Sequence, residues 1–294
     1  MSIGADTVCL ECFLRKNVET ARKFGDAEKL TLFTKELMAL LAALPADKST
    51  PYIAPQVSDL FSNYYGVGED RYKAEKEQSN AFAKAWFDQA LAMAQQAADP
   101  VLAGLQMAIL GNYLDFSALQ GKVDFDQLEQ MMQNALHTQL DEAVLAQLKN
   151  DLSKAKKLLY ITDNAGEIGF DRVCARQLQT AYPDLEITFC VRGGAALNDA
   201  TREDALEVGV EFPVIDNGTD IGGTVLHRIG QEMKNALDEA DVIIAKGMGN
   251  TESMYGCGYN VYYAFLIKCD RFIQYFNKPK MTPMFIRDKA FVER

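Results

Sequence analysis

Apolar side chains recur every three or four residues through the first half of the chain. Residues 26–44 show one apolar helix face, made by Leu30, Phe33, Leu37, Leu40, Leu41 and Leu44. The run stops at Pro45, because proline cannot continue a helix. Further helices are predicted over 69–98, 101–116 and, as one or two, 124–150. The pattern therefore predicts an all-helical N-terminal region over residues 1–154.

The rhythm changes at Ala155, where short apolar runs begin to alternate with helical stretches. Strands are predicted over 157–162, 185–191, 210–215 and 241–245, and 271–276 and 283–286 complete the set after one more helical stretch. Such alternation is typical of right-handed crossovers in a parallel sheet. Residues 155–294 are thus predicted to form an α/β unit with a mainly parallel sheet.

Ligands of parallel sheets bind beyond the carboxyl ends of the strands. The loops that follow the predicted strands would all lie at that edge. They carry many polar residues: Asp163, Asn164, Glu167, Asn198, Asp199, Asp216, Asn217, Lys246, Asn250 and Glu252. This edge of the sheet is the expected binding site.

The loop after the first predicted strand reads Asp163-Asn164-Ala165-Gly166-Glu167. A carboxylate beside an amide oxygen can hold a hard divalent cation. Gly166 permits a tight turn, and the first N–H groups of the following helix can face an anion. An ordinary strand-to-helix turn, capped by Asp163 or Asn164, explains these residues about equally well.

The loop after the second predicted strand contains Asn198-Asp199-Ala200-Thr201, and Asp204 lies nearby. Asp199 can supply a second carboxylate to the same cation. Asn198 or Asp199 as a helix N-cap is the more usual reason for such residues at this position. Taken alone, this loop favours the capping interpretation.

The loop after the fourth predicted strand reads Lys246-Gly247-Met248-Gly249-Asn250-Thr251-Glu252. A lysine beside two glycines suits a phosphate, because it offers a point charge and exposed backbone N–H groups. The residue order differs from that of a Walker loop. A flexible glycine-rich loop with a solvated lysine explains the string equally well.

These loops are stronger evidence together than singly. Two carboxylates, an asparagine oxygen, a lysine and several glycines converge on one edge of the sheet. Oxygen-only ligation suits Mg²⁺ or Mn²⁺ and phosphoryl chemistry. In the helical half, Asn112 and Asp115 interrupt an apolar helix and would need polar partners, so we expect them to face the same edge.

Charge and composition narrow the class of protein. The chain of 294 residues has 41 acidic and 30 basic side chains and a formal net charge of −11, which argues against a nucleic-acid-binding surface. No apolar run approaches the ~18–20 residues that a membrane span requires. Without a recognisable secretion signal, the six cysteines are expected to be reduced thiols in the cytoplasm. Cys9-x-x-Cys12 has no second pair, and burial on a helix face explains it better than zinc.

Together, the motifs resemble the damage-control phosphatase family, first named domain of unknown function 89, which also includes a proposed acidic-residue methyltransferase. The matching stretches are 163–167, 197–201 with 203–205, 246–252, and Gly111-Asn112 with Asp115. Cys9-x-x-Cys12 is similar to the mark of the stand-alone prokaryotic subgroup. Four motifs in the same order make the resemblance specific, and it extends over nearly the whole chain.

The resemblance implies a Rossmann-like α/β/α core with the helical region packed on it. It also implies a divalent-metal phosphatase (Mg, Mn, Co or Ni) that acts on small phosphorylated metabolites, often damaged ones. By the same resemblance, Asp163, Asn164 and Asp199 would be the metal ligands and Lys246 the phosphate contact. The residues that would line the substrate pocket are Glu167, Asn112, Asp115, Gly247, Gly249 and Asn250.

One signature of the family's sugar-phosphate subgroup is missing. That subgroup carries R-T-x-K near its C-terminus, whereas the nearest string here is Arg287-Asp288-Lys289. The resemblance therefore gives no support for a preference for fructose or ribose phosphates.

The favoured hypothesis is in-line attack on phosphorus by a metal-bound water that Asp163 or Asp199 positions. A nucleophilic Asp163 is disfavoured, because phosphatases of that kind usually carry a second acid two residues on, where this chain has Ala165. A methyltransferase that uses S-adenosylmethionine is expected to have two glycines two positions apart in the first loop, but Gly166 and Gly169 are three positions apart. A non-catalytic nucleotide- or phosphate-binding protein is the remaining alternative.

Overall fold

A six-stranded sheet forms the centre of the computed structural model, which describes residues 3–45, 47–67, 72–115 and 124–292. The strand order is β3-β2-β1-β4-β5-β6. The strands are β1 (Lys157–Ile161), β2 (Glu186–Val191), β3 (Val214–Asp216), β4 (Val242–Lys246), β5 (Val261–Leu266) and β6 (Pro283–Arg287). Pairing is parallel from β3 to β5, and β6 is antiparallel to β5. The predicted, mainly parallel sheet is confirmed.

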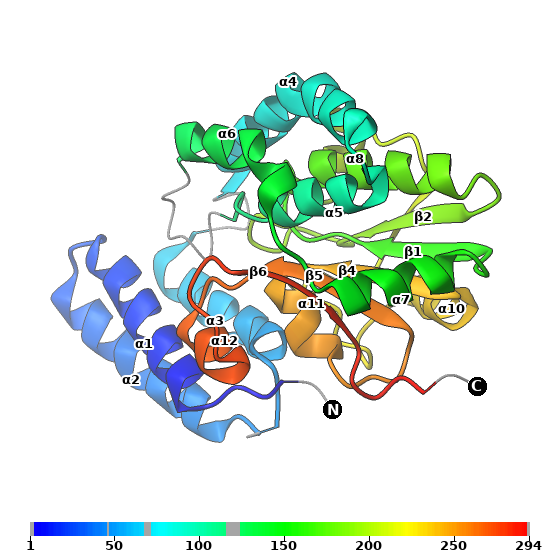
Figure 1. Ribbon diagram of the computed structural model, residues 1–294. Coiled ribbons are helices and arrows are strands. Elements are labelled where there is room, and N and C mark those ends of the chain that lie inside the picture. The colour runs from blue at the N-terminus through cyan, green and yellow to red at the C-terminus, as the bar shows by residue number, and fades with distance from the viewer. Residues whose placement is uncertain (1–2, 46, 68–71, 116–123, 293–294) are drawn as a thin grey trace.

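Helices cover both faces of this sheet (Figure 1). One face shares an apolar core with α4 (Lys73–Gln96), α5 (Pro100–Gly111), α6 (Phe125–Gln133), α7 (Glu142–Leu152), α8 (Glu167–Ala181) and α9 (Arg202–Glu207). The other face packs on α10 (Gln231–Glu239), α11 (Gly247–Met254) and α12 (Asp270–Phe276). Because both faces are covered, β4 and β5 are buried at every position. The three-layer α/β/α core is as predicted.

The first three helices form an apolar cluster of their own. These are α1 (Thr7–Arg22), α2 (Ala27–Ala43) and α3 (Thr50–Tyr65). Phe33, Leu37 and Phe61 lie at the centre of this cluster. The helices from α4 to α7 instead share their core with the sheet. A domain boundary between residues 154 and 155 stays a prediction, and the apolar packing divides the helices before it into two groups.

The helices α2 and α4 to α7 lie within or close to the predicted ranges, whereas α1 and α3 had no predicted range of their own. α4 and α5 cover most of 69–98 and 101–116, and the predicted ends at 69 and 116 lie outside the described residues. In the part of the chain that the structure describes, no helix is both long enough and apolar enough to cross a membrane.

The C-terminal third corrects two predictions. The stretch after Lys246, predicted as helical, contains α11 and then β5, and residues 271–276, predicted as a strand, belong to α12. β5 is apolar at every position, so periodicity could not distinguish it from a buried helix. In α12, the rings of Phe272 and Phe276 both pack on Phe265 of β5, which requires the helical spacing.

Candidate active site

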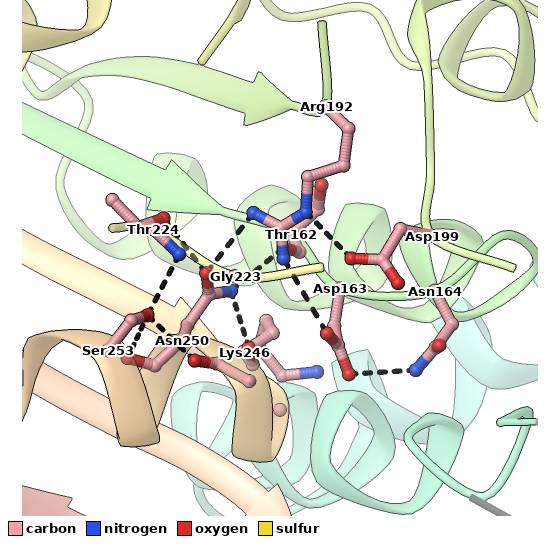
Figure 2. A network of polar contacts seen from close by, with 12 residues as sticks. Thr162, Asp163, Asn164, Arg192, Asp199, Gly223, Thr224, Lys246, Asn250 and Ser253 are labelled. Atoms are coloured by element: carbon pink, nitrogen blue, oxygen red, sulfur yellow. Dashed lines mark hydrogen bonds and ion pairs between the residues drawn. The ribbon is translucent and has the colours of Figure 1, made fainter. Parts of the chain in front are cut away.

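Two loops at the carboxyl ends of β1 and β2 are joined by backbone hydrogen bonds. The amide of Ala165 donates to the carbonyl of Asn198 (2.9 Å), and the amide of Ala200 donates to the carbonyl of Asp163 (2.8 Å). Parallel pairing of β1 with β2 brings the loops to one edge of the sheet (Figure 2). The three side chains predicted as metal ligands therefore meet there: Asp163, Asn164 and Asp199.

Asp163 is buried and oriented by two side-chain amides. Its Oδ2 accepts hydrogen bonds from Nδ2 of Asn164 (2.8 Å) and Nδ2 of Asn112 (3.0 Å). Gly247, the residue after β4, lies directly against this carboxylate, and a Cβ there would stand 1.9 Å from Oδ2. Gly247 also has a φ of +77°, which favours glycine. Only glycine fits beside Asp163 at this position.

Arg192, the first residue after β2, bridges the two carboxylates. Its Nε donates to Oδ2 of Asp199 (2.7 Å), and its Nη2 lies 3.7 Å from Oδ1 of Asp163. Its Nη1 donates to Oδ1 of Asn250 (3.2 Å). Within the described residues, no hydrogen bond reaches Oδ1 of either Asp163 or Asp199. Each acid therefore keeps an oxygen that can bind another group.

The carboxylates are difficult to ionise together in this buried place. Burial, with Asp199 and Glu167 close by, raises the pKa of Asp163 well above its usual range. Burial also raises the pKa of Asp199 to about 6, although Arg192 acts in the opposite direction. A bound cation would stabilise the charged form of both acids.

The donor set at this edge fits a hard divalent cation. It consists of carboxylate and amide oxygens, the ligands that Mg²⁺ and Mn²⁺ prefer. Among the described residues, no three His, Cys, Asp or Glu side chains are grouped so as to hold a metal. Two carboxylates would therefore need amide, water or substrate oxygens to complete the coordination. Mg²⁺ commonly binds in this way, because it keeps several waters.

Lys246 is the last residue of β4, and its ammonium group is fully enclosed. Nζ donates to the carbonyl of Ala108 (2.7 Å), to Oε1 of Glu167 (2.6 Å) and to Oδ1 of Asp171 (2.8 Å). Burial by itself would lower the pKa of Lys246, but Asp171 and Glu167 outweigh it and raise the pKa. The lysine is therefore charged, and three protein oxygens already occupy its donors. Its role as a phosphate contact stays a prediction, and these surroundings do not favour it.

Glu167 connects Lys246 to the ligand loop. Its Oε2 accepts hydrogen bonds from Nδ2 of Asn112 (2.8 Å) and Nδ2 of Asn164 (2.7 Å). The preceding Gly166 has a φ of +75° and lies so close to Ser79 that a Cβ would meet it at 2.5 Å. Lys246 can thus act on Asp163 indirectly, through Glu167 and the two amides.

Asn112 and Asp115 follow α5, which ends at Gly111 and not at residue 116 as predicted, and both face the sheet edge as expected. Oδ1 of Asn112 accepts a hydrogen bond from the amide of Leu266 (3.1 Å). Nζ of Lys268 donates to Oδ2 of Asp115 (2.6 Å) and to the carbonyl of Asn112 (2.7 Å). Asn112 and Asp115, two polar residues of this apolar stretch, therefore have partners close to the carboxylates.

Asn250 of α11 joins three strand-end loops (Figure 2). Its Nδ2 donates to the carbonyls of Thr162 (3.0 Å) and Lys246 (2.7 Å). Its Oδ1 accepts from the hydroxyl of Thr224 (2.9 Å) as well as from Arg192. The neighbouring Gly249 allows close approach, because a Cβ there would stand 2.3 Å from the carbonyl oxygen of Gly222.

Sequence reasoning gave no role to two buried cations, Arg192 and Lys268. Arg192 follows a correctly predicted strand, so its place at the strand end was a usable signal. Lys268 follows β5, which was predicted as helical, and a correct assignment would have placed it at the same edge. Both form ion pairs with buried carboxylates of the site: Arg192 with Asp199 and Lys268 with Asp115.

The string Arg287-Asp288-Lys289 lies away from this edge. Arg287 is paired with Tyr262 near the start of β5, because β6 runs antiparallel. Its Nη2 contacts Oδ2 of Asp151 on α7 (2.5 Å), and Asp288 accepts a hydrogen bond from the hydroxyl of Tyr263 (2.9 Å). The string belongs to the opposite end of the strands.

The cysteines of the described residues are free thiols. Cys9 and Cys12 lie one turn apart in α1, and Cys9 is buried. Burial raises the pKa of Cys9 to about 12, which keeps it protonated. This favours the prediction that the pair are packed residues of a helix.

Comparison with known proteins agrees with the motifs. A family model described as the damage-control phosphatase ARMT1-like domain matches residues 5–282. The chain belongs to this family. An uncharacterized protein of Methanocaldococcus jannaschii, MJ0202, is 32% identical over 96% of this chain and 91% of its own length. A protein of Archaeoglobus fulgidus named damage-control phosphatase is 28% identical over 84% of this chain and 86% of its own length.

A solved structure supports the same assignment. A crystal structure of a DUF89 family protein from Pyrococcus horikoshii, PH1575, superposes with a TM-score of 0.81 at 25% identity, covering 97% of this chain and 99% of that chain. In sequence comparison, the P. horikoshii protein is named a damage-control phosphatase and is 32% identical over 63% of this chain and 64% of its own length. The family indicated by the motifs, and with it the class of activity, a damage-control phosphatase, is confirmed.

Proposed function

We propose that this protein hydrolyses phosphoric monoesters of small metabolites with the help of a divalent cation. The observation that carries the proposal is the joined pair of loops at the ends of β1 and β2. They hold Asp163 and Asp199 buried, close together and each with one oxygen free of hydrogen bonds within the described residues. Such a pair of acids is costly unless a cation binds between them.

In this proposal Asp163, Asn164 and Asp199 hold Mg²⁺, Mn²⁺, Co²⁺ or Ni²⁺. When bound, such a cation lowers the pKa of a coordinated water and neutralises charge on phosphoryl oxygens. Oδ1 of Asp163 or Asp199, which accepts no hydrogen bond within the described residues, would orient the attacking water, so that the water meets phosphorus in line with the leaving group. The amides of Asn112 and Asn164 keep Asp163 in one orientation while this happens.

The other loop residues of the motifs would shape the pocket. Gly247 lets the backbone pack directly against Asp163, and Gly249 lets α11 pack against the backbone of Gly222, since a Cβ at either position would collide. Asn250 fixes the distance between the loops. Lys246 would act as a positioning residue: its charge balances Glu167 and Asp171, and Glu167 in turn orients Asn112 and Asn164.

Replacing the central acid tests this proposal. In Asp163→Asn, we expect turnover of a generic aryl phosphate to fall by about a hundredfold or more, because one ligand charge and the group that orients water are lost. Released phosphate is measured with Mg²⁺, Mn²⁺, Co²⁺ and Ni²⁺ supplied separately. Asp88→Asn, which changes an exposed acid of α4, is the matched control and should keep wild-type activity.

Wild-type turnover by Asp163→Asn would refute the assignment of this residue. If the wild-type protein releases no phosphate from a broad panel of phosphorylated metabolites with any of the four metals, the proposed hydrolysis is wrong. The same panel identifies the substrate class, because the rates can be compared across sugars, acids and nucleotides.

A further inference from the structure

Arg192 has one polar atom that its surroundings leave unsatisfied. The residue is only 2% exposed. Nε and Nη1 are hydrogen-bonded to Asp199 and Asn250, whereas Nη2 is buried and has no hydrogen-bond partner among the described residues. Oδ1 of Asp163, at 3.7 Å, is too far for a hydrogen bond. A buried charged donor without an acceptor is unfavourable, so a missing partner is the natural explanation.

The direction of this donor is determined by rigid neighbours. Oδ2 of Asp199 holds Nε at 2.7 Å. Asn250, which holds Nη1, is itself anchored to the carbonyls of Thr162 and Lys246. Figure 2 shows the guanidinium group between Asp163, Asp199 and Asn250. Nη2 is therefore already held beside the two carboxylates, 3.7 Å from Oδ1 of Asp163, before any ligand arrives.

The ammonium groups of the other two buried cations already donate hydrogen bonds to protein oxygens. Lys246 donates to Glu167, Asp171 and a carbonyl, and Lys268 donates to Asp115 and a carbonyl. Both ammonium groups are fully buried and face carboxylates. Of these three cations, Arg192 is the one with a buried donor that has no hydrogen-bond partner among the described residues.

We infer that Nη2 of Arg192 binds an oxygen of the phosphoryl group, so that Arg192 takes the phosphate-binding role predicted for Lys246. This inference rests on the proposed function and names the group that recognises the reacting part of the substrate. A guanidinium group suits a tetrahedral oxyanion, because its planar donors remain charged at any physiological pH. Since Asp163 and Asp199 adjoin it, phosphate should bind well only when a divalent cation offsets their charge.

A purely structural role for Arg192 predicts a different result. If the arginine served only to orient Asp199, its removal would weaken binding of the metal and of phosphate together. If the arginine binds phosphate directly, its removal should lower the affinity for phosphate alone. Metal affinity should then stay the same or rise, because a competing positive charge has left the two carboxylates.

Calorimetry separates these roles. Binding of Mn²⁺ alone is measured first, followed by binding of inorganic phosphate to the Mn²⁺-loaded protein. In Arg192→Gln, we expect phosphate affinity to fall about tenfold or more, the usual effect of losing a charged hydrogen bond, with Mn²⁺ affinity unchanged or higher. Arg202→Gln is the matched control, because Arg202 is half-exposed and pairs with Asp216 at the surface. It should bind phosphate as the wild type does.

A second variant guards against loss of folding. Arg192→Lys keeps the positive charge beside Asp199 but loses the planar fork, and its phosphate affinity should fall severalfold. The inference is overturned if either variant binds phosphate like the wild type, if Mn²⁺ and phosphate affinity fall together, or if the wild-type protein binds no phosphate. Phosphate binding that depends on Arg192 in a protein without turnover would support this inference while refuting the proposed hydrolysis.

Discussion

Asp163 is constrained on every side by a different kind of contact. Two amides hold one of its oxygens, Arg192 lies 3.7 Å from the other, and the backbone of Gly247 closes the remaining side. Each constraint comes from a different element, so the carboxylate has little freedom to rotate. Adding a side chain at Gly247 should therefore displace the Asp163 carboxylate and alter the predicted metal site.

Gly247→Ala should impair metal binding more than folding. Its Cβ would overlap Oδ2 of Asp163, and the loop must move to relieve the collision. We expect Mn²⁺ affinity and aryl phosphatase activity to fall about tenfold or more, as is usual when the support of a metal ligand is lost. Calorimetry and steady-state assays measure the two quantities.

Gly66→Ala is the matched control for backbone strain. Gly66 also has a positive φ, +66°, but a Cβ there would meet nothing within 4 Å. Both alanines should cost roughly 1–2 kcal/mol of stability from the left-handed backbone alone. If Gly247→Ala lowers only the unfolding temperature, as Gly66→Ala should, then Gly247 is required for its backbone conformation and not for the space beside Asp163.

At the scale of elements, α11 connects the site to the N-terminal helices. It begins at Gly247, carries Asn250, and presents Glu252 to the start of α3. One oxygen of Glu252 accepts hydrogen bonds from both the amide and the hydroxyl of Thr50. Burial outweighs these bonds and raises the pKa of Glu252 to about 7, from an ordinary value of 4.5. The junction between α3 and α11 should therefore respond to pH.

Glu252→Gln should become relatively more stable than the wild type as pH rises. Between pH 4.5 and about 7 the folded protein keeps the Glu252 proton that the unfolded chain has lost, so the wild type loses stability as pH increases through this window. The variant carries no charge to bury. From pH 5 to pH 8 we expect the difference in unfolding free energy to shift toward the variant by a few kcal/mol at most, on the order of 3.

Urea unfolding at several pH values measures this difference. Glu77→Gln, at an exposed position of α4, is the control and should show no comparable trend. A constant difference between Glu252→Gln and the wild type from pH 5 to pH 8 would contradict the raised pKa of Glu252.

At the scale of the whole molecule, the described residues form three apolar clusters. Two lie on the opposite faces of the sheet, and the third joins α1, α2 and α3 around Phe33. The ring of Phe33 contacts those of Phe61, Tyr64 and Tyr65, with centroids 5.5, 5.6 and 5.5 Å away. These three helices lie beside the sheet layers in Figure 1. Their stability should therefore be partly separate from that of the sheet.

Phe33→Ala should loosen α1, α2 and α3 before the sheet. Removing a fully buried phenyl ring typically costs about 3–5 kcal/mol. Hydrogen exchange should show loss of amide protection in residues 7–65, with smaller changes in β1 and β4. Phe33→Leu, which leaves a smaller cavity, should show the same pattern to a lesser degree. An equal loss of protection in the helices and the sheet would mean that the protein opens as one unit.

Elements with local signals were predictable from the chain alone. The α2 helix has both its apolar spacing and a terminating Pro45, and β1, β2 and β4 are short apolar runs followed by polar turns. β5 is an apolar run like β4, but it continues into Ile267-Lys268-Cys269 and not directly into a glycine turn, so the sequence does not show that it is a strand. Because of that ambiguity, residues 261–266 were predicted as helical and residues 271–276 as a strand, the reverse of the observed structure.

The same limit applies to the site. That Asp163, Asn164 and Asp199 meet follows from parallel strand order, which the alternating pattern and the family motifs already indicate. The contacts of Lys246 and Arg192 do not follow from it. Their partners, such as Ala108 and Asp171 for the lysine and Asn250 for the arginine, come from elements far away in the sequence.

The amino-acid sequence by itself determined the α/β class and the edge of the sheet where chemistry is expected, because periodicity and turn residues act locally. Its motifs indicated the family by their resemblance to known members. Only the tertiary structure decided that Arg192 keeps an unpaired donor beside the carboxylates, whereas the donors of Lys246 are occupied by protein oxygens. A charged side chain takes the partners that remain after α5, α8 and α11 have packed, and that packing depends on contacts between segments more than a hundred residues apart in the chain.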